Sequence, residues 1–181
     1  MKFTQKVLQL VLLEGKLEWK NKQSVTALFI YSFSSIFVTY LAFQQTIDLT
    51  TWNSLFWIIL LFASTNAIAK SFLQDSKGLQ LFYYSMFSPK QLILAKTLYN
   101  QILLIGLSLI NFLIFQLVFP IAIYQIGQYL LSLILGAIGL STVLTLVAGI
   151  VSKANNNAAL LAILGFPLLF PLLSIIIQKK K

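Results

Sequence analysis

Very few side chains in this 181-residue chain could do chemistry. It has no histidine and no cysteine, and its acidic residues are Glu14, Glu18, Asp48 and Asp75. These absences exclude Ser-His and Cys-His catalytic pairs, thiolate or imidazole metal sites, and a histidine ligand from this chain to haem iron. No GxxxxGK[ST] or HExxH motif is present, and no two carboxylates share an apolar segment. We therefore expect no enzyme and no catalytic or metal site, so energy must come from a partner.

Three amides are the polar side chains that stand out within long apolar segments. Asn111 and Gln116 lie deep in one segment, and Asn66 lies just before Lys70 at the end of another. An unpaired amide is costly away from water, so these side chains are expected either to bond to neighbouring helices or to line an interior polar path. Both alternatives stay open from the residues alone.

The composition identifies the setting as a membrane. Hydrophobic residues make up 59% of the chain and charged residues 9%, and the mean hydropathy is +0.88. Such a chain needs lipid around it. The net charge of +9 comes from thirteen lysines that cluster where apolar segments end, which is typical of cytoplasmic ends and argues against nucleic acid as a partner. The first 23 residues lack the features of a secretory signal, so we expect the N-terminus to be retained.

The pattern predicts an all-α, polytopic helical membrane protein with a single domain over residues 1–181. Residues 1–23 carry apolar and lysine residues on different faces and are expected to form an amphipathic helix at the membrane interface. Five hydrophobic segments follow as predicted spans, at residues 24–43, 52–69, 98–119, 128–151 and 158–177. The lysines place the N-terminus and the 70–97 loop in the cytoplasm.

The 70–97 loop is the long polar interruption in the chain, and we predict that a soluble partner docks there. Leu79, Phe82 and Met86 recur at helical spacing and form an apolar stripe. Ser88, Pro89 and Gln91 have the order of a capping box, which predicts a new helix from Pro89.

Small residues recur every four positions in the fourth span, at Ala137, Ser141, Thr145 and Gly149. Such a stripe lets another helix approach closely. We interpret it as a packing surface.

The last hydrophobic segment breaks the charge pattern. It contains Gly165, Pro167 and Pro171 and is expected to be kinked or broken, and three lysines follow it at 179–181. Five simple spans would put those lysines on the outer side, against the positive-inside rule. Two interpretations would return the last lysines to the cytoplasmic side or account for their position: the segment turns back at its prolines, or a further span belongs after it.

Two long stretches, residues 52–96 and 131–173, together with an N-terminal segment that ends in Glu-Trp-Lys, resemble the haem exporter B family of cytochrome c maturation proteins. The resemblance covers nearly the whole chain. It includes the spacing of Phe72, Asp75, Gly78, Ser88, Pro89, Ala95 and Lys96 and the KANNN turn, and it is closest to the versions in Bacteroidetes-type bacteria.

The resemblance implies an ABC-2-like permease subunit of a multi-pass inner-membrane transporter. Its implied partners are an ATP-binding subunit, other cytochrome c maturation proteins and the lipid bilayer, with haem as cargo and no bound cofactor. Asp75, Gly78, Ser88 and Pro89 match the family's cytoplasmic loop pattern, and we expect them, with the apolar stripe of that loop, to contact the ATPase. The alternatives are a permease for another cargo and a scaffold that transports nothing.

The chain departs from the family in one respect. The family usually has six spans, and this sequence ends after the fifth. This agrees with the lysine count, and it predicts a C-terminally truncated form, for example through a frameshift in the codons of the lysine run.

Overall fold

The protein is described by a computed structural model, which covers residues 3–20, 22–43, 47–73, 83, 86–121, 125–152 and 158–178. This part of the chain is all-α, as predicted. Its six helices are α1 (Phe3–Lys20), α2 (Lys22–Phe43), α3 (Leu49–Leu73), α5 (Pro89–Val118), α6 (Ile126–Val151) and α7 (Ala158–Gln178).

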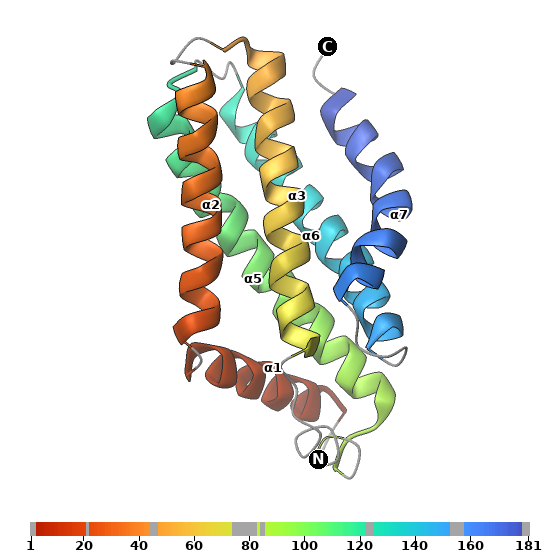
Figure 1. The fold of residues 1–181 in the computed structure, drawn as a ribbon. Coiled ribbons are helices and arrows are strands. Elements are labelled where there is room, and N and C mark those ends of the chain that lie inside the picture. The colour runs from red at the N-terminus through yellow and green to blue at the C-terminus, as the bar shows by residue number, and fades with distance from the viewer. Residues whose placement is uncertain are drawn as a thin grey trace.

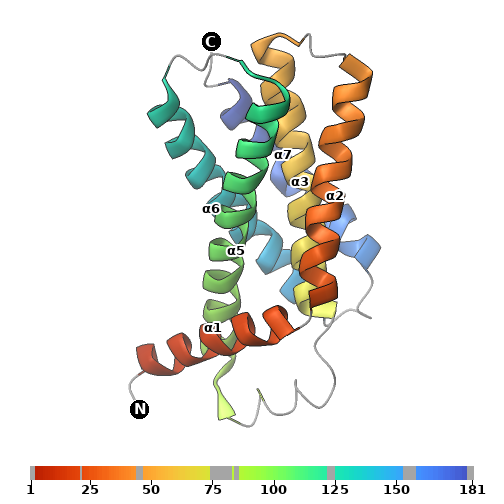
Figure 2. The same cartoon turned by 90° about the vertical axis from the view of Figure 1, so that its left-hand side faces the viewer.

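Five long helices stand side by side, and α1 lies across one end of them (Figure 1). The quarter-turn view in Figure 2 shows α1 crossing beside α5 at that end. The N-terminus lies at the α1 end and the C-terminus at the opposite end. The bundle therefore has two distinct ends, one covered by α1 and one not.

The core between α3, α5 and α6 is aromatic at the end away from α1. Trp52 and Phe56 stack with ring centroids 5.8 Å apart, and the Trp52 ring meets Phe115 at 5.2 Å and Tyr129 at 5.7 Å. The outer surface is apolar too: Val38 of α2, Leu117 of α5 and Phe170 of α7 are largely exposed. A water-soluble chain rarely exposes so much apolar surface, so these faces fit lipid contact.

Four stretches of helix are long and apolar enough to cross a membrane: Thr26–Phe43, Leu49–Phe72, Pro89–Val118 and Ile126–Val151. The fifth predicted span is a helix, α7, but it is not one of these four, so the count of five spans stays a prediction. Helix α3 continues to Leu73, beyond the predicted end of the second span at residue 69, whereas α5 begins at Pro89, as the capping box predicted.

The starts of α3 and α5 are both capped by side chains. The Ser88 hydroxyl accepts a hydrogen bond from the Gln91 amide at 3.4 Å, and the Ser88 amide donates to Gln91 Oε1 at 3.0 Å, so the predicted capping box is confirmed. Asp48 accepts from the amides of Thr50 and Thr51 at 3.1 and 3.2 Å. Hydrogen bonds from Thr51 lower the pKa of Asp48 and favour the charged cap.

Helix α7 corrects the expectation for the last segment. It continues unbroken through Pro167 and Pro171 and reaches the end of the bundle opposite α1 (Figure 1), so it does not turn back at its prolines. The reason is packing along α6 and α3. Gly165 is buried, and a Cβ added there would lie 3.4 Å from Leu144 Cδ2 of α6, so α7 packs closely against α6 at this point.

Helix α1 uses only part of its predicted apolar face for packing. Val7 and Leu10 are buried, whereas Phe3 and Leu17 are exposed. Its position at a membrane interface stays a prediction.

Candidate functional site

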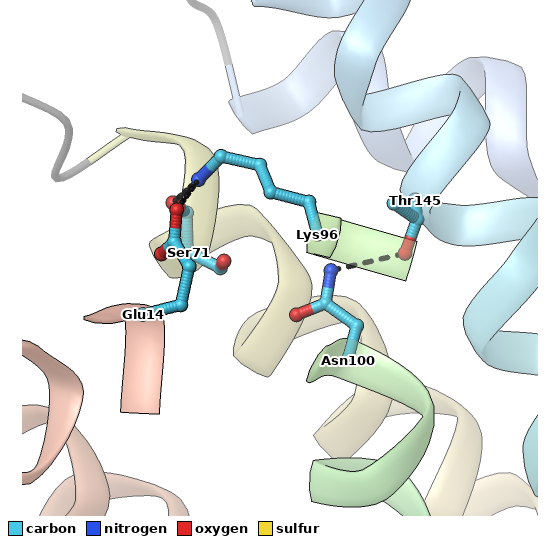
Figure 3. A network of polar contacts seen from close by, with 5 residues as sticks. All are labelled: Glu14, Ser71, Lys96, Asn100 and Thr145. Atoms are coloured by element: carbon cyan, nitrogen blue, oxygen red, sulfur yellow. Dashed lines mark hydrogen bonds and ion pairs between the residues drawn. The ribbon is translucent and has the colours of Figure 1, made fainter. Parts of the chain in front are cut away.

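A buried lysine joins three helices at the α1 end of the bundle (Figure 3). Lys96 of α5 is 3% exposed, and its Nζ lies 3.3 Å from Glu14 Oε1 of α1. The same ammonium donates a hydrogen bond to the Ser71 carbonyl near the end of α3 at 3.2 Å and lies 4.9 Å from the centre of the Phe72 ring. One charged group therefore contacts α1, α3 and its own helix.

The spacing of apolar residues along α1 explains why the Glu14 carboxylate is buried. Val7, Leu10 and Glu14 follow one another at steps of three and four residues, so they share one face of the helix. Val7 and Leu10 pack with Ala95 of α5 and with Tyr83, which precedes that helix. This apolar cluster shields the adjacent Glu14 and Lys96 pair from water.

A second carboxylate of α1 lies one turn further along. Glu18 accepts a hydrogen bond from the Tyr99 hydroxyl of α5. Burial raises the pKa of Glu18, and the Tyr99 bond partly offsets that rise. Gly15 lies between the two acids, where a Cβ would be 3.6 Å from Tyr99 Cε2, so the two helices approach closely.

One turn deeper, amides of α5 bond to hydroxyls of α6. Asn100 Nδ2 donates to Thr145 Oγ1 at 3.0 Å (Figure 3), and Gln101 Nε2 donates to Thr142 Oγ1 at 3.0 Å. Thr145 belongs to the small-residue stripe, whose members Ala137 and Ser141 are also buried. At Gly149, a Cβ would lie 3.9 Å from the Phe72 ring of α3. The stripe therefore packs against other helices, as predicted.

The three amides singled out from the sequence are not brought together. Asn111 is 2% exposed, and neither side-chain polar atom has a hydrogen-bond partner among the described residues. Gln116 Nε2 donates a hydrogen bond to the Ile121 carbonyl at 2.7 Å. This bond ties the end of α5 to the segment that follows it. Asn66 is exposed on α3. None of these three forms a hydrogen bond between helices in the described structure.

Four of the seven predicted docking residues, Asp75, Gly78, Leu79 and Phe82, lie outside the described residues. Met86 is 56% exposed, while Ser88 and Pro89 are exposed at the start of α5. Whether these residues bind a partner stays a prediction.

Sequence reasoning missed the pairing of Glu14 with Lys96 and of Asn100 with Thr145. The available signal was Glu14 itself, which falls in the apolar period of Val7 and Leu10. An acid on that face needs a buried cation. Among the described residues, no three acidic, histidine or cysteine side chains come together as a metal site.

Comparison with known families decides the assignment. A family model described as CcmB protein matches residues 5–178. The chain belongs to the CcmB protein family. Membership confirms the resemblance to the haem exporter B family, and CcmB implies a multi-pass membrane protein of haem export in cytochrome c maturation. No curated protein and no solved structure matches the chain significantly.

Proposed function

We propose that the chain is the membrane permease subunit of an ABC transporter that exports haem for c-type cytochrome maturation. The observation that carries this proposal is the CcmB match over residues 5–178. Helices long and apolar enough to cross a membrane support it. The chain forms one domain in the inner membrane with its N-terminus in the cytoplasm, and a separate subunit hydrolyses ATP.

The ATP-binding subunit docks on the 70–97 segment, beside α1. Tyr83 and Phe87 of this segment pack with Val7 and Leu10 of α1, which supports treating α1 and the segment as one body. Lys96 of α5 contacts Glu14 of α1 and the Ser71 carbonyl of α3, so it links α1 to both of these helices. A push on the docking segment would therefore reach the membrane helices through a buried, charged contact.

Complementation tests the cargo. Cells that lack the gene, and hold no second copy, are complemented with this chain, and their membrane and periplasmic proteins are stained for covalent haem. Loss of c-type haem on deletion and its return on complementation are expected. Unchanged staining on deletion would refute the haem role and leave a permease for another cargo or a scaffold.

Co-purification with the ATP-binding subunit tests the docking surface. Replacing Asp75 and Gly78 together, or Met86→Asp alone, should reduce capture of that subunit in detergent. Gln128→Asp is the control because Gln128 is exposed at the start of α6, at the end of the bundle opposite α1. Full capture by both loop variants would remove the segment from the docking proposal.

A further inference from the structure

Helix α1 separates its acidic side chains from its basic ones. Its two acids, Glu14 and Glu18, both turn toward α5, where they meet Lys96 and the Tyr99 hydroxyl. The lysines that the structure describes on α1 are exposed or half-buried instead: Lys6, Lys16 and Lys20. No acid of α1 is therefore left beside these lysines on the side away from α5.

Helical spacing puts the three lysines on one side of α1. At about 100° per residue, Lys16 and Lys20 lie about 40° apart, and Lys6 lies about 40° from Lys20 on the other side. Leu8 and Leu12, one turn apart, form an adjoining flank and are 62% and 58% exposed. These five residues, which we call the outer face of α1, combine a basic side with an apolar side.

The chain path indicates the depth of the outer face. Helix α1 lies across the end of the bundle, and its first turns extend past α5 (Figure 2). It ends at Lys20, six residues (26 − 20) before Thr26, where the first stretch that is apolar enough to cross a membrane begins. Six helical residues rise about 9 Å. The headgroup layer on each side of the hydrocarbon is about 5–8 Å thick, so this rise matches the depth of lipid headgroups.

We propose that the outer face of α1 binds the headgroups of anionic phospholipids. The lysine ammonium groups attract lipid phosphates, and their long stems reach the headgroups while Leu8 and Leu12 enter the acyl-chain boundary. A neutral surface would leave the basic side without a counter-charge, and water would leave the two leucines uncovered. The inference goes beyond transport, because it rests only on the chain lying in a bilayer and holds for any cargo.

The absence of native cysteine allows the lipid beside α1 to be identified. Leu12→Cys is labelled with a bimane fluorophore in the full chain, which is reconstituted in nanodiscs of mixed phosphatidylglycerol and phosphatidylcholine. Bromine on the acyl chains of one lipid or the other quenches a nearby fluorophore, so the ratio of the two quenching efficiencies shows which lipid is enriched. Leu117→Cys is the matched control site, because Leu117 is 82% exposed on α5 at the end opposite α1.

Phosphatidylglycerol should be enriched at Leu12→Cys by at least about threefold relative to Leu117→Cys, since each lysine near an anionic surface favours association by about fivefold. Replacing Lys6, Lys16 and Lys20 together by glutamine should remove the enrichment, whereas replacing all three by arginine should keep it. Salt at about 0.5 M should weaken the enrichment when the lysines are intact. If the glutamine variant does not purify as a folded protein, the salt titration takes its place.

Equal quenching by the two brominated lipids at Leu12→Cys overturns the proposal, as does an enrichment that survives the glutamine substitutions or the added salt. Quenching by neither lipid also overturns it, because the outer face would then meet water.

An excess of the purified ATP-binding subunit tests for a protein partner on the same face. The quenching at Leu12→Cys should persist, and its loss would overturn the proposal and assign the outer face to that subunit. The lipid measurements themselves need neither haem nor the subunit, so their failure is distinguishable from a failed haem assay.

Discussion

Replacing Lys96 by methionine should destabilise the protein strongly, because it leaves the Glu14 carboxylate buried without its cation. The Lys96 and Glu14 side chains are only 4% and 8% exposed, so water screens the pair little. Removing one partner of such a buried pair costs about 3–5 kcal/mol. The lost bond to the Ser71 carbonyl and the lost contact with the Phe72 ring act in the same direction.

The double variant Glu14→Leu/Lys96→Met removes both buried charges together. It therefore measures what the ion pair contributes to stability after the cost of burying the two charges is included. Two apolar side chains of similar volume need no partner, so the double variant should lie within about 1 kcal/mol of the unmodified chain or above it. Lys90→Met is the matched control, since Lys90 is exposed near the start of the same helix. Its unfolding free energy should change by less than about 0.5 kcal/mol.

Unfolding of the purified protein in detergent, followed by tryptophan fluorescence, gives these free energies. Limited proteolysis adds a local measurement, because loss of the Lys96 contact should release α1 and speed cleavage near it. The reasoning is refuted if Lys96→Met unfolds like Lys90→Met, or if the double variant is as unstable as Lys96→Met.

Further predictions concern single contacts. Burial raises the pKa of Glu18 above its ordinary 4.5, so the folded chain holds a proton that the unfolded chain releases, and stability should fall as pH rises from 4.5 through the raised value. Glu18→Gln should flatten that slope in melting curves recorded from about pH 4 to about pH 7. Asn100→Leu should cost about 0.6–1.7 kcal/mol in unfolding free energy, and much less when Thr145 is already Val. Ser88→Ala should cost about 1 kcal/mol and speed amide hydrogen exchange in the first turn of α5.

Local signals predicted most of the helices. Charge-free apolar length identified the long helices, and the capping box at Ser88 located the start of α5, because both depend on residues close together in the chain. The predicted end of the third span at residue 119 agrees with the end of α5 at Val118. Such features need no knowledge of the partner helix.

Contacts between distant segments were not predicted. The sequence shows that Glu14 falls on an apolar face, but Lys96 was one of thirteen lysines that might have met it. The continuity of α7 through two prolines was likewise not predicted from local preference, because α7 packs along α6 and α3 over its length. Tertiary packing decided both outcomes.

The two asparagines of α5 show how the neighbouring helix sets the role of a buried amide. Asn100 and Asn111 are eleven residues apart (111 − 100), and at about 100° per residue they face within about 20° of each other. Asn100 meets Thr145 of α6, whose last turns also carry Ser141 and Thr142, whereas the buried α6 positions nearer its start include Leu133 and Ala137. Hydroxyls can satisfy an amide and apolar side chains cannot, so Asn100 has a partner on α6 whereas Asn111 has none among the described residues.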